Sequence, residues 1–596
     1  MATTTRTGRV ERKRKDQVAG LDDWDAWVAH LAARKPFIPF ADYSSSVTDW
    51  PLLWPLSSEF SDSDAAELVA FLARWKPSTS TTPSLVRRLE QWLERVEGRD
   101  QDAALAMECL AWTLVLPQLT AVLPRAPWCQ LLDSLLAVVE RSSRFDLLAD
   151  PLTYLLLRGE LPWVLSRTFP ELATTAALGE PAKATLSHAI LELLDGEGLP
   201  HSRFWSQFRA GLACWTRCMV VGRVSQEACF TDEAAAQFAW LVRESIRFSR
   251  RDGTLMLGET AIEPGRWTLL QTALVMLSSE LDQQLAATVW PRRSVLNAKS
   301  RPARASKGTR AVSGKSELPA PAVHSEWAAA AMLRRSWTPT EPSLAITWGR
   351  RQVDFELSVQ GRTMLSGCWD YQVELDGQRL QPIDDYVEVC WVSDEDVSYL
   401  ELEVQLTGDC RLQRQILLTQ DRFVFLADAV LGNQIAELQY RSTLPLSPGV
   451  EFVAEAETSE GILKARRPLT VVLPLDLSEW RVPPRGQSLE QTSAGLQLQR
   501  RGRTTRMFNA LFLDVDPSRV RQPRTWRQLT VAQRLERQAD DVAVGYRVQI
   551  GLQQWLFYRS LAAKANRTVL GQNFNTDFVA ARFFPNGTIH KLLEIE

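Results

Sequence analysis

The spacing of apolar residues changes once along the chain. Up to about residue 290, apolar positions recur at intervals of three and four, which is the pattern of helices that bury one face. After Ser325 the interval falls to two. Between Val353 and Val359 every second residue is apolar and Gly361 follows as a turn signal, which is typical of a strand with one buried face. The sequence therefore predicts a helical half followed by an all-β half.

The helical half contains a series of amphipathic segments separated by proline- and glycine-rich loops. Thr231, just before Ala234, has the side chain and the position of a helix N-cap. Apolar residues on more than one face indicate helices packed in layers, as in an α/α toroid or an α-solenoid. A solenoid would repeat a signature every 34 to 47 residues or so, and none is seen, which favours the toroid. The predicted helices span residues 21–31, 62–75, 84–97, 103–116, 128–141, 151–158, 181–195, 202–218, 232–248 and 267–286.

The second half contains many short strands separated by turn signals, which predicts an antiparallel β-sandwich. The turn signals are Asp376-Gly377, Gly408-Asp409, Gln420-Asp421, Gly432-Asn433 and Asn586-Gly587. The predicted strands span residues 343–347, 352–359, 370–375, 387–391, 399–406, 411–419, 422–431, 437–444, 469–473, 495–501, 505–513, 541–550 and 553–560.

Two polar, basic stretches set the predicted domain limits. Residues 1–20 read as a disordered basic N-terminus, and residues 291–325 as a flexible linker, because residues 292–315 hold eight basic residues and no acid. The basic charges of this linker have two interpretations: electrostatic binding of an anionic polymer, or a connector exposed to solvent. The solvent-exposed connector is favoured. The helical domain is thus predicted over 21–290 and the β-sandwich over 326–596.

Composition limits the classes of partner. The chain has 596 residues, and 45% of them are hydrophobic, as in a globular protein. Its formal net charge is only −3, so no overall electrostatic attraction favours a nucleic acid or a membrane as partner. No apolar run reaches the roughly 18 residues of a membrane span, and the N-terminus lacks the apolar core of a signal peptide, which predicts a cytoplasmic location. The 22 tryptophans are consistent with two roles: packing in the core of layered helices, or stacking on sugars as exposed rings.

The sequence lacks the common catalytic motifs: there is no phosphate-binding glycine loop, no Gly-x-Ser-x-Gly elbow and no His-Glu-x-x-His. Cys214 and Cys218 share one helix face, but no second cysteine or histidine pair at zinc spacing accompanies them, so no metal site is expected there. Asp394 and Asp396 could bind a structural divalent cation or simply line a solvated loop. No cofactor is predicted.

The order of the domains and one strand motif together resemble the heparinase II/III-like polysaccharide lyases, which pair an α/α toroid with a β-sandwich. In that family a Gly-x-His-x-His-x-Asp-like run opens the sandwich. The positions that match it and the hairpin after it are Gly349, Gln352, Asp354, Gly361, Leu365 and Gly367. The segments 411–417 and 422–428 resemble the paired strands that follow in the family, where a hairpin ends in an acidic residue, here Asp428.

The resemblance implies a lyase that works by β-elimination on an acidic polysaccharide in a groove between the domains. Such a reaction needs a group that neutralises the uronate, a base and an acid. This sequence departs from the family at two places. Gln352 stands at the motif histidine, and no tyrosine follows the Asp252-Gly253 turn within residues 254–267. A divergent member with a degenerate catalytic motif is the resulting hypothesis.

Nine residues remain as candidates for the site. His201, at the end of a loop, Tyr154 and His324 are the candidate catalytic residues, although the apolar surroundings of Tyr154 favour a packed core residue over a catalytic one. The candidate substrate-binding residues are Arg203, Arg350, Arg351, Gln352, Asp354 and Trp369. The leading function is binding, with or without cleavage, of a uronate-containing polysaccharide. The alternatives are a catalytically silent carbohydrate-binding or scaffold protein and an all-α adaptor fused to an unrelated sandwich.

Overall fold

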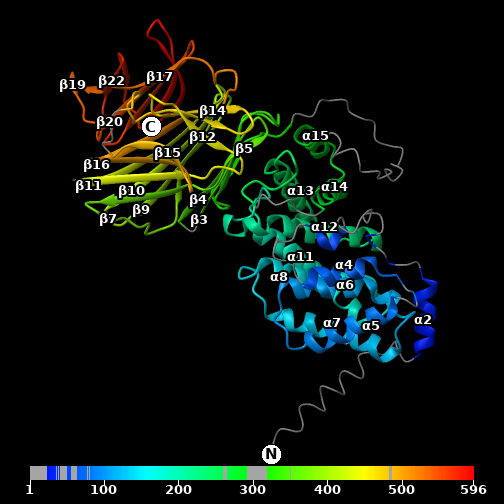
Figure 1. The fold of residues 1–596 in the computed structure, drawn as a ribbon. Helices are drawn as coiled ribbons and strands as arrows, with labels where there is room; N and C mark the ends of the chain where they lie inside the picture. Colours follow the sequence, from blue (N-terminus) through cyan, green and yellow to red (C-terminus); the bar gives the residue numbers. More distant parts are fainter. Residues whose placement is uncertain are drawn as a thin grey trace, which may run out of the picture. The chain divides into compact units, whose positions relative to one another are not determined.

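A computed structural model describes most of the chain, and the chain folds into two compact units, residues 1–313 and 314–596. Figure 1 draws both as a ribbon coloured along the sequence. The predicted basic N-terminus and most of the predicted linker lie outside the described residues. The described residues are 23–34, 37, 39–40, 50–54, 64–76, 78, 81–258, 265–291, 318–349, 351–481 and 486–596.

The first unit is helical, as predicted. Its longer helices are α2 (Trp24–Ala33), α4 (Asp64–Arg74), α5 (Thr82–Val96), α6 (Ala103–Leu119), α7 (Arg125–Arg141), α9 (Leu161–Thr168), α11 (Gly179–Leu193), α12 (Phe208–Ser225), α13 (Asp232–Arg247), α14 (Arg266–Leu277) and α15 (Glu280–Val289). Shorter turns connect them: η3 (Pro51–Leu53), η4 (Ser142–Arg144), α8 (Pro151–Tyr154), the π-helical turn η5 (Leu155–Glu160), α10 (Ala173–Ala176) and η6 (Ser202–Gln207).

The helices pack in layers because several of them are apolar on more than one face. Helix α6 is buried almost all round, and it contacts α4, α7 and α9. Helix α11 contacts α9 and α13, and α12 contacts α13 and α14. Thr231 caps α13 by accepting a hydrogen bond from the backbone N–H of Ala234, as the sequence predicts. Within the described residues, no helix is both long enough and apolar enough to cross a membrane.

Three predicted helices are divided in the structure. The one over 151–158 begins as α8 and continues as the π-helical turn η5. Residues 202–218 begin as the 3₁₀ turn η6, which His201 caps, and become α-helical only at Phe208. The predicted helix over 267–286 is two helices, since Ser278 takes a left-handed conformation (φ 55°) and the side chain of Ser279 caps α15 through the N–H of Asp282.

One buried acid on α13 makes the stability of the helical unit depend on pH. Burial raises the pKa of Glu244 from its ordinary 4.5 to about 7, although the neighbouring Arg247 opposes the shift. The folded state therefore binds more protons than the unfolded state between these two values, so the free energy of unfolding should fall as pH rises from about 4.5 to 7, by about 1.4 kcal/mol per unit. Denaturation of wild type and Glu244→Gln across this range measures the difference, and parallel pH profiles would contradict it.

The second unit is built of antiparallel sheets. The first sheet is the meander β1 (Val323–Ser325), β2 (Ala330–Arg334), β3 (Ser343–Gly349), β4 (Gln352–Val359) and β5 (Arg362–Cys368). The central sheet has the order β12-β13-β14-β16-β11-β10-β9-β8, with β15 paired to β16, β6 to β11 and β7 to β6. Its strands are β6 (Asp370–Leu375), β7 (Gln378–Arg379), β8 (Val387–Ser393), β9 (Val397–Leu406), β10 (Cys410–Thr419), β11 (Phe423–Leu444), β12 (Glu451–Ala454), β13 (Gly461–Lys464), β14 (Pro468–Pro474), β15 (Ser488–Thr492) and β16 (Gly495–Asp514).

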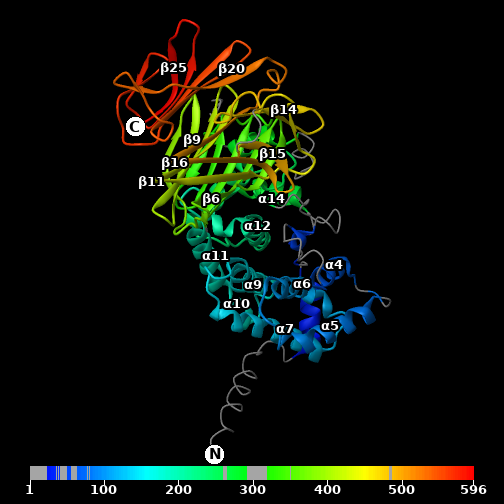
Figure 2. The same cartoon turned by 60° about the vertical axis from the view of Figure 1, so that its left-hand side comes forward.

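Two further sheets extend the sandwich beyond two layers. The third sheet has the order β17-β20-β21-β24-β25 and the fourth β19-β18-β22-β23. Figure 2 shows β20 and β25, in orange and red, as a layer distinct from β9, β11 and β16. Their strands are β17 (Arg524–Leu529), β18 (Ala532–Gln533), β19 (Glu536–Arg537), β20 (Ala543–Ile550), β21 (Gln553–Ser560), β22 (Arg567–Val569), β23 (Gln572–Phe574), β24 (Phe578–Phe583) and β25 (Ile589–Ile595).

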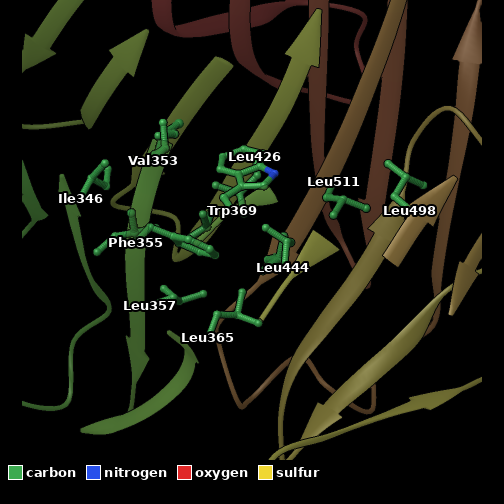
Figure 3. Close-up of a cluster of buried hydrophobic side chains, with 14 of the residues drawn as sticks. Ile346, Val353, Phe355, Leu357, Leu365, Trp369, Leu426, Leu444, Leu498 and Leu511 are labelled. Atoms are coloured by element: carbon green, nitrogen blue, oxygen red, sulfur yellow. The ribbon is translucent and has the colours of Figure 1, made fainter. Parts of the chain in front are cut away.

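Both faces of the central sheet are buried. Its face toward the first sheet packs Leu426 and Leu511 against Phe355 and Trp369, whose rings lie 5.8 Å apart (Figure 3). Its other face forms a second, aromatic-rich core with the third sheet, in which the rings of Phe425 and Phe557 stack at 4.8 Å. A smaller third core lies between the third and fourth sheets. The near-continuous apolar runs of β11 and β16 follow from this double burial.

One predicted turn is wrong. Gly432-Asn433 does not end a strand, because β11 continues through it to Leu444. Strand β16 pairs with β11 on both sides of this point, and the register shifts between Leu431 and Ala436. The predicted strands 422–431 and 437–444 are thus one bulged strand, and 495–501 and 505–513 are another. A side chain at Gly432 would meet the carbonyl oxygen of Thr505 at 2.9 Å, which explains why the bulge has glycine here.

Candidate functional site

His201 lies at the beginning of η6, where its ring caps the turn. Its Nδ1 accepts a hydrogen bond from the backbone N–H of Arg203 at 3.2 Å. In a neutral imidazole an accepting Nδ1 leaves the proton on Nε2. The ring in this state is a hydrogen-bond donor at Nε2 and has no uncommitted lone pair with which to take a proton.

The Asp252-Gly253 turn packs directly against η6. Trp205 of η6 donates from Nε1 to the carbonyl of Met256 at 3.0 Å, and its ring lies 4.9 Å from that of Phe248. Gly253 has φ 84°, and a Cβ there would lie 2.9 Å from the ring of Trp267, so this turn needs glycine. The structure thus brings together two features that the sequence places fifty residues apart, His201 with Arg203 and the Asp-Gly turn.

Arginines surround this turn. Arg209, which is 3% exposed, donates to the carbonyl of Gly253 at 3.4 Å, and Arg266 donates to the carbonyl of Asp252 at 2.8 Å. Arg250 donates to Thr254 at 3.0 Å, which braces the turn from within. Arg251, at the tip of the turn, is exposed. The segment 249–258 is therefore a turn held rigid by three arginines, with a fourth directed to solvent.

Arg203 is a second exposed cation, on the η6 turn that contacts this segment through Trp205. Its guanidinium is held over the ring of Phe204 at 4.6 Å from the ring centroid. We call Arg203, Arg251 and the turn that carries Arg251 the arginine surface. Sequence reasoning selected Arg203 but missed Arg250, Arg251 and Arg266. The run Arg250-Arg251-Asp252-Gly253 was a usable signal, because two cations beside a glycine turn are held at the surface.

Tyr154 is a core residue of the helical unit. It is 7% exposed at the end of α8, and the guanidinium of Arg158 covers its ring at 4.9 Å. Its apolar neighbours on η5, Leu155 to Leu157, are also buried. Its ring is therefore packed within the helical unit.

Three candidate substrate-binding residues gather at the β3–β4 hairpin. Arg351 is an exposed residue at the turn (φ 63°), and Gln352 donates from Nε2 to Oδ1 of Asp354 at 3.0 Å. Burial raises the pKa of Asp354, while the hydrogen bond from Gln352 opposes the shift. Arg350 lies outside the described residues. Gln352 and Asp354 brace each other, and Arg351 is the exposed cation of the group.

Trp369 lies beneath this hairpin in the core. Its ring is 3% exposed, its Nε1 donates to the hydroxyl of Ser442 at 2.7 Å, and the guanidinium of Arg414 stacks on it at 3.9 Å. Figure 3 shows it among the buried side chains of the first core. Both ring faces are therefore packed against protein, and the structure presents neither to a sugar.

His324 lies in strand β1 and not in the connecting segment. Its Nε2 is 3.0 Å from Oε1 of Glu388, and its ring stacks on Trp391 at 4.8 Å. Glu388 and Trp391 belong to β8, which lies at the edge of the central sheet, while β1 lies at the edge of the first sheet. The His324–Glu388 pair thus closes the open edge of the sandwich.

Strand register separates His324 from the hairpin group. His324 pairs with Ala331, Ala331 with Ile346, and Ile346 with Phe355, so three strand spacings of about 4.8 Å, or about 14 Å, lie between His324 and β4. Phe355 faces the core, whereas its neighbour Asp354 points to the opposite face of the sheet. The structure therefore does not bring His324 and Asp354 to one site.

One group of potential metal ligands occurs among the described residues: Glu160, Cys214 and Cys218, all buried. Both carboxylate oxygens of Glu160 already accept hydrogen bonds from Arg217, each at 2.6 Å. Burial raises the pKa of the Cys214 and Cys218 thiols. A protonated thiol pair beside a guanidinium does not suit a cation. Asp394 accepts from the N–H groups of Asp396 and Val397, which is the geometry of a turn.

Comparisons with known proteins find likeness in structure and not in sequence. No family model and no curated protein matches the chain. A crystal structure of heparinase III matches with a TM-score of 0.62 at 10% identity, covering 90% of this chain and 95% of that one. A second heparinase III gene product matches at 0.60 and 11% identity, covering 94% and 98%. A mutant heparan sulfate lyase from Pedobacter heparinus matches at 0.58 and 11% identity, covering 91% and 94%.

These matches cover nine-tenths or more of each chain, so the likeness includes both units. The predicted fold class, a toroid-like helical domain followed by an antiparallel β-sandwich domain, is confirmed by them. The chain has the fold of the heparinase III and heparan sulfate lyase structures.

Proposed function

We propose that this protein binds an acidic polysaccharide, with the arginine surface of the helical unit as the contact. The observation that carries the proposal is the exposure of two arginines, Arg203 on η6 and Arg251 at the tip of a turn that three other arginines touch or brace and whose segment contacts η6 through Trp205. A guanidinium is planar and always charged, and it pairs with a carboxylate or a sulfate through two parallel hydrogen bonds. Support comes also from the fold, since the similar structures are a heparinase and a heparan sulfate lyase.

His201 contributes to this surface by capping η6: its Nδ1 accepts a hydrogen bond from the backbone N–H of Arg203, which fixes the backbone from which Arg203 projects. Arg351 on the β3–β4 hairpin offers a further cation in the second unit.

Binding without turnover is the form of this function that the geometry supports best. β-Elimination needs an acid for the leaving oxygen, and Tyr154, the candidate for it, is packed under Arg158. Gln352 stands where the resembling family has a histidine, and an amide does not take up a proton at neutral pH. A uronate lyase remains the second candidate, favoured by the fold alone.

Removing the two exposed guanidiniums should weaken polysaccharide binding. We expect Arg203→Gln with Arg251→Gln to lower the affinity for heparan sulfate oligosaccharides about tenfold or more, because each change removes a charge-assisted hydrogen bond. Isothermal titration at two salt concentrations measures this, and wild-type affinity should fall as salt rises. Arg223→Gln, at an exposed position of α12, is the matched control and should bind as wild type.

Unchanged affinity in the double variant would overturn the proposed contact. Turnover is tested on the same samples by the ultraviolet absorbance of an unsaturated uronate product, with heparin, heparan sulfate, alginate and hyaluronan as substrates. Product from wild type that Tyr154→Phe abolishes would favour the lyase over the binding protein.

A further inference from the structure

The layer between the central and third sheets changes from apolar to polar along its strands. At one end it is filled by rings such as Phe423, Phe425 and Phe557. Toward the other end the same face of β9 and β10 presents Glu401 and Gln413, which meet Arg559 of β21. Burying polar side chains costs free energy unless each of them has a hydrogen-bond partner. Packing alone therefore does not explain this polar layer.

A chain of hydrogen bonds connects the core to the surface through this layer. Tyr399 donates to Glu401 at 2.5 Å, and Arg559 donates from Nη2 to Glu401 at 2.9 Å and to Gln413 at 2.5 Å. Gln413 in turn donates to Glu403 at 2.7 Å, which lies 3.6 Å from the guanidinium of Arg411. The side chains are thus held in fixed positions from the core to the rim.

This chain ends at a pocket of about 570 Å³ that lies wholly within the second unit. The β11 bulge at Gly432-Asn433 forms part of its wall, and Arg411, Gln413, Arg506 and Arg559 line it. Its volume falls in the range of small-molecule sites, about 300–1,000 Å³. Bulges are common beside binding sites because they redirect side chains, which fits a bulge at this position.

Arg559 supplies a buried cation with unused hydrogen-bonding capacity. It is 5% exposed, and while Nη2 is bonded to Glu401 and Gln413, its Nε and Nη1 have no hydrogen-bond partner among the described residues. Buried guanidinium N–H groups without acceptors are costly. An oxygen of a ligand in this pocket is the natural acceptor.

Further cations stand at the rim. Arg506 donates from Nη1 only to the carbonyl of Asp541, at 3.4 Å, and forms no ion pair within the described part of the chain. Lys564 lies 3.6 Å from Asp577 and is half exposed. Of the four cations that line the pocket, Arg411, Arg559 and Lys564 are each paired with an acid, so Arg506 is the cation whose charge is left for an anionic ligand.

We propose that this pocket binds a sugar acid, either free or as the terminal unit of an acidic oligosaccharide. Arg506 and Arg559 would take the carboxylate, while the amide of Asn433 can donate to and accept from sugar hydroxyls and the carboxylate of Asp409 can accept from them. The pocket is separate from the arginine surface of the helical unit, so either proposal can fail while the other stands.

Titration of the full chain with glucuronate, glucose and inorganic sulfate, each at matched ionic strength, tests the proposal. Glucuronate should bind, and glucose at least tenfold more weakly, because glucose lacks the carboxylate. A glucuronate-terminated disaccharide distinguishes the two sources: tighter binding than glucuronate identifies an oligosaccharide end, and equal binding a free sugar acid.

Variants locate the binding in the pocket. Arg506→Gln should weaken glucuronate binding at least tenfold, whereas Arg503→Gln, at an exposed position on the same strand β16, should bind as wild type. Arg506 is half-buried at the rim, so its replacement should leave the unfolding midpoint near that of wild type, which denaturation checks. Glucose binding as tightly as glucuronate, sulfate binding as tightly as glucuronate, or full affinity in Arg506→Gln would each overturn the proposal.

Discussion

Replacing Arg414 with methionine should lower the free energy of unfolding of the β-sandwich unit by about 3–5 kcal/mol. Arg414 and Asp428 are both 0% exposed, and they pair through two hydrogen bonds of 2.9 and 2.8 Å. The two residues lie directly opposite each other in the β10–β11 hairpin. Removing the guanidinium would leave the carboxylate buried without its counter-charge, and this is more costly than the loss of a surface pair.

The surroundings of this pair explain why so large an effect is expected. Arg414 also donates to the carbonyl of Trp369 at 2.8 Å and stacks on that ring, and the hydroxyl of Tyr440 donates to Asp428 at 2.6 Å. Losing Arg414 therefore disturbs the connection between the first and central sheets. Urea denaturation at neutral pH measures the cost.

Two comparisons isolate the buried charge. Arg411→Met, on the same strand but half exposed, should cost about 1 kcal/mol or less. Combining Arg414→Met with Asp428→Leu should recover most of the lost stability, because no charge is then left buried. A double variant as unstable as Arg414→Met alone would show that packing, and not the unpaired charge, is responsible.

Arg217→Met should destabilise the helical unit by a similar amount, about 3–5 kcal/mol. Arg217 of α12 and Glu160 of η5 are 1% and 0% exposed, and both of their hydrogen bonds measure 2.6 Å. Arg217 also donates to the carbonyl of Pro51 at 3.3 Å, so it connects three segments far apart in the sequence.

The control for this change lies on the same helix. Arg223→Met, at an exposed position in the last turn of α12, should shift the denaturation midpoint little. Pairing Arg217→Met with Glu160→Leu should restore stability if the buried carboxylate is the cause. Equal effects of the Arg217 and Arg223 changes would contradict the prediction.

The candidate site divides into residues that the sequence could identify and residues that it could not. His201 and Arg203 were found because a loop before a helix exposes side chains, and the structure places them on η6, which contacts the segment of the Asp252-Gly253 turn through Trp205. Trp369 was selected from its position beside the strand motif. Its burial could not be read from the motif, because the partner that covers it, Arg414, lies 45 residues away.

The β11 bulge shows the same limit. Gly432-Asn433 has the composition of a hairpin turn, and a local reading makes it one. The pairing with β16, some seventy residues later, keeps the chain extended through this point, and the resulting register shift helps to form the pocket at Arg559. No pattern within β11 itself carries this information.

Although strands such as β2, β5 and β24 were not predicted, the sequence by itself determined the helical and β halves, the position of the change between them and the approximate limits of most long helices and strands. These follow from local periodicity, since a buried face imposes a spacing of three to four on a helix and of two on a strand. Only the tertiary structure decided that Tyr154 and Trp369 are packed, that His324 and Asp354 lie apart, and that arginines gather around one turn. Those outcomes depend on contacts between residues distant in the chain, and the physical pattern that predicts an element does not specify its partner.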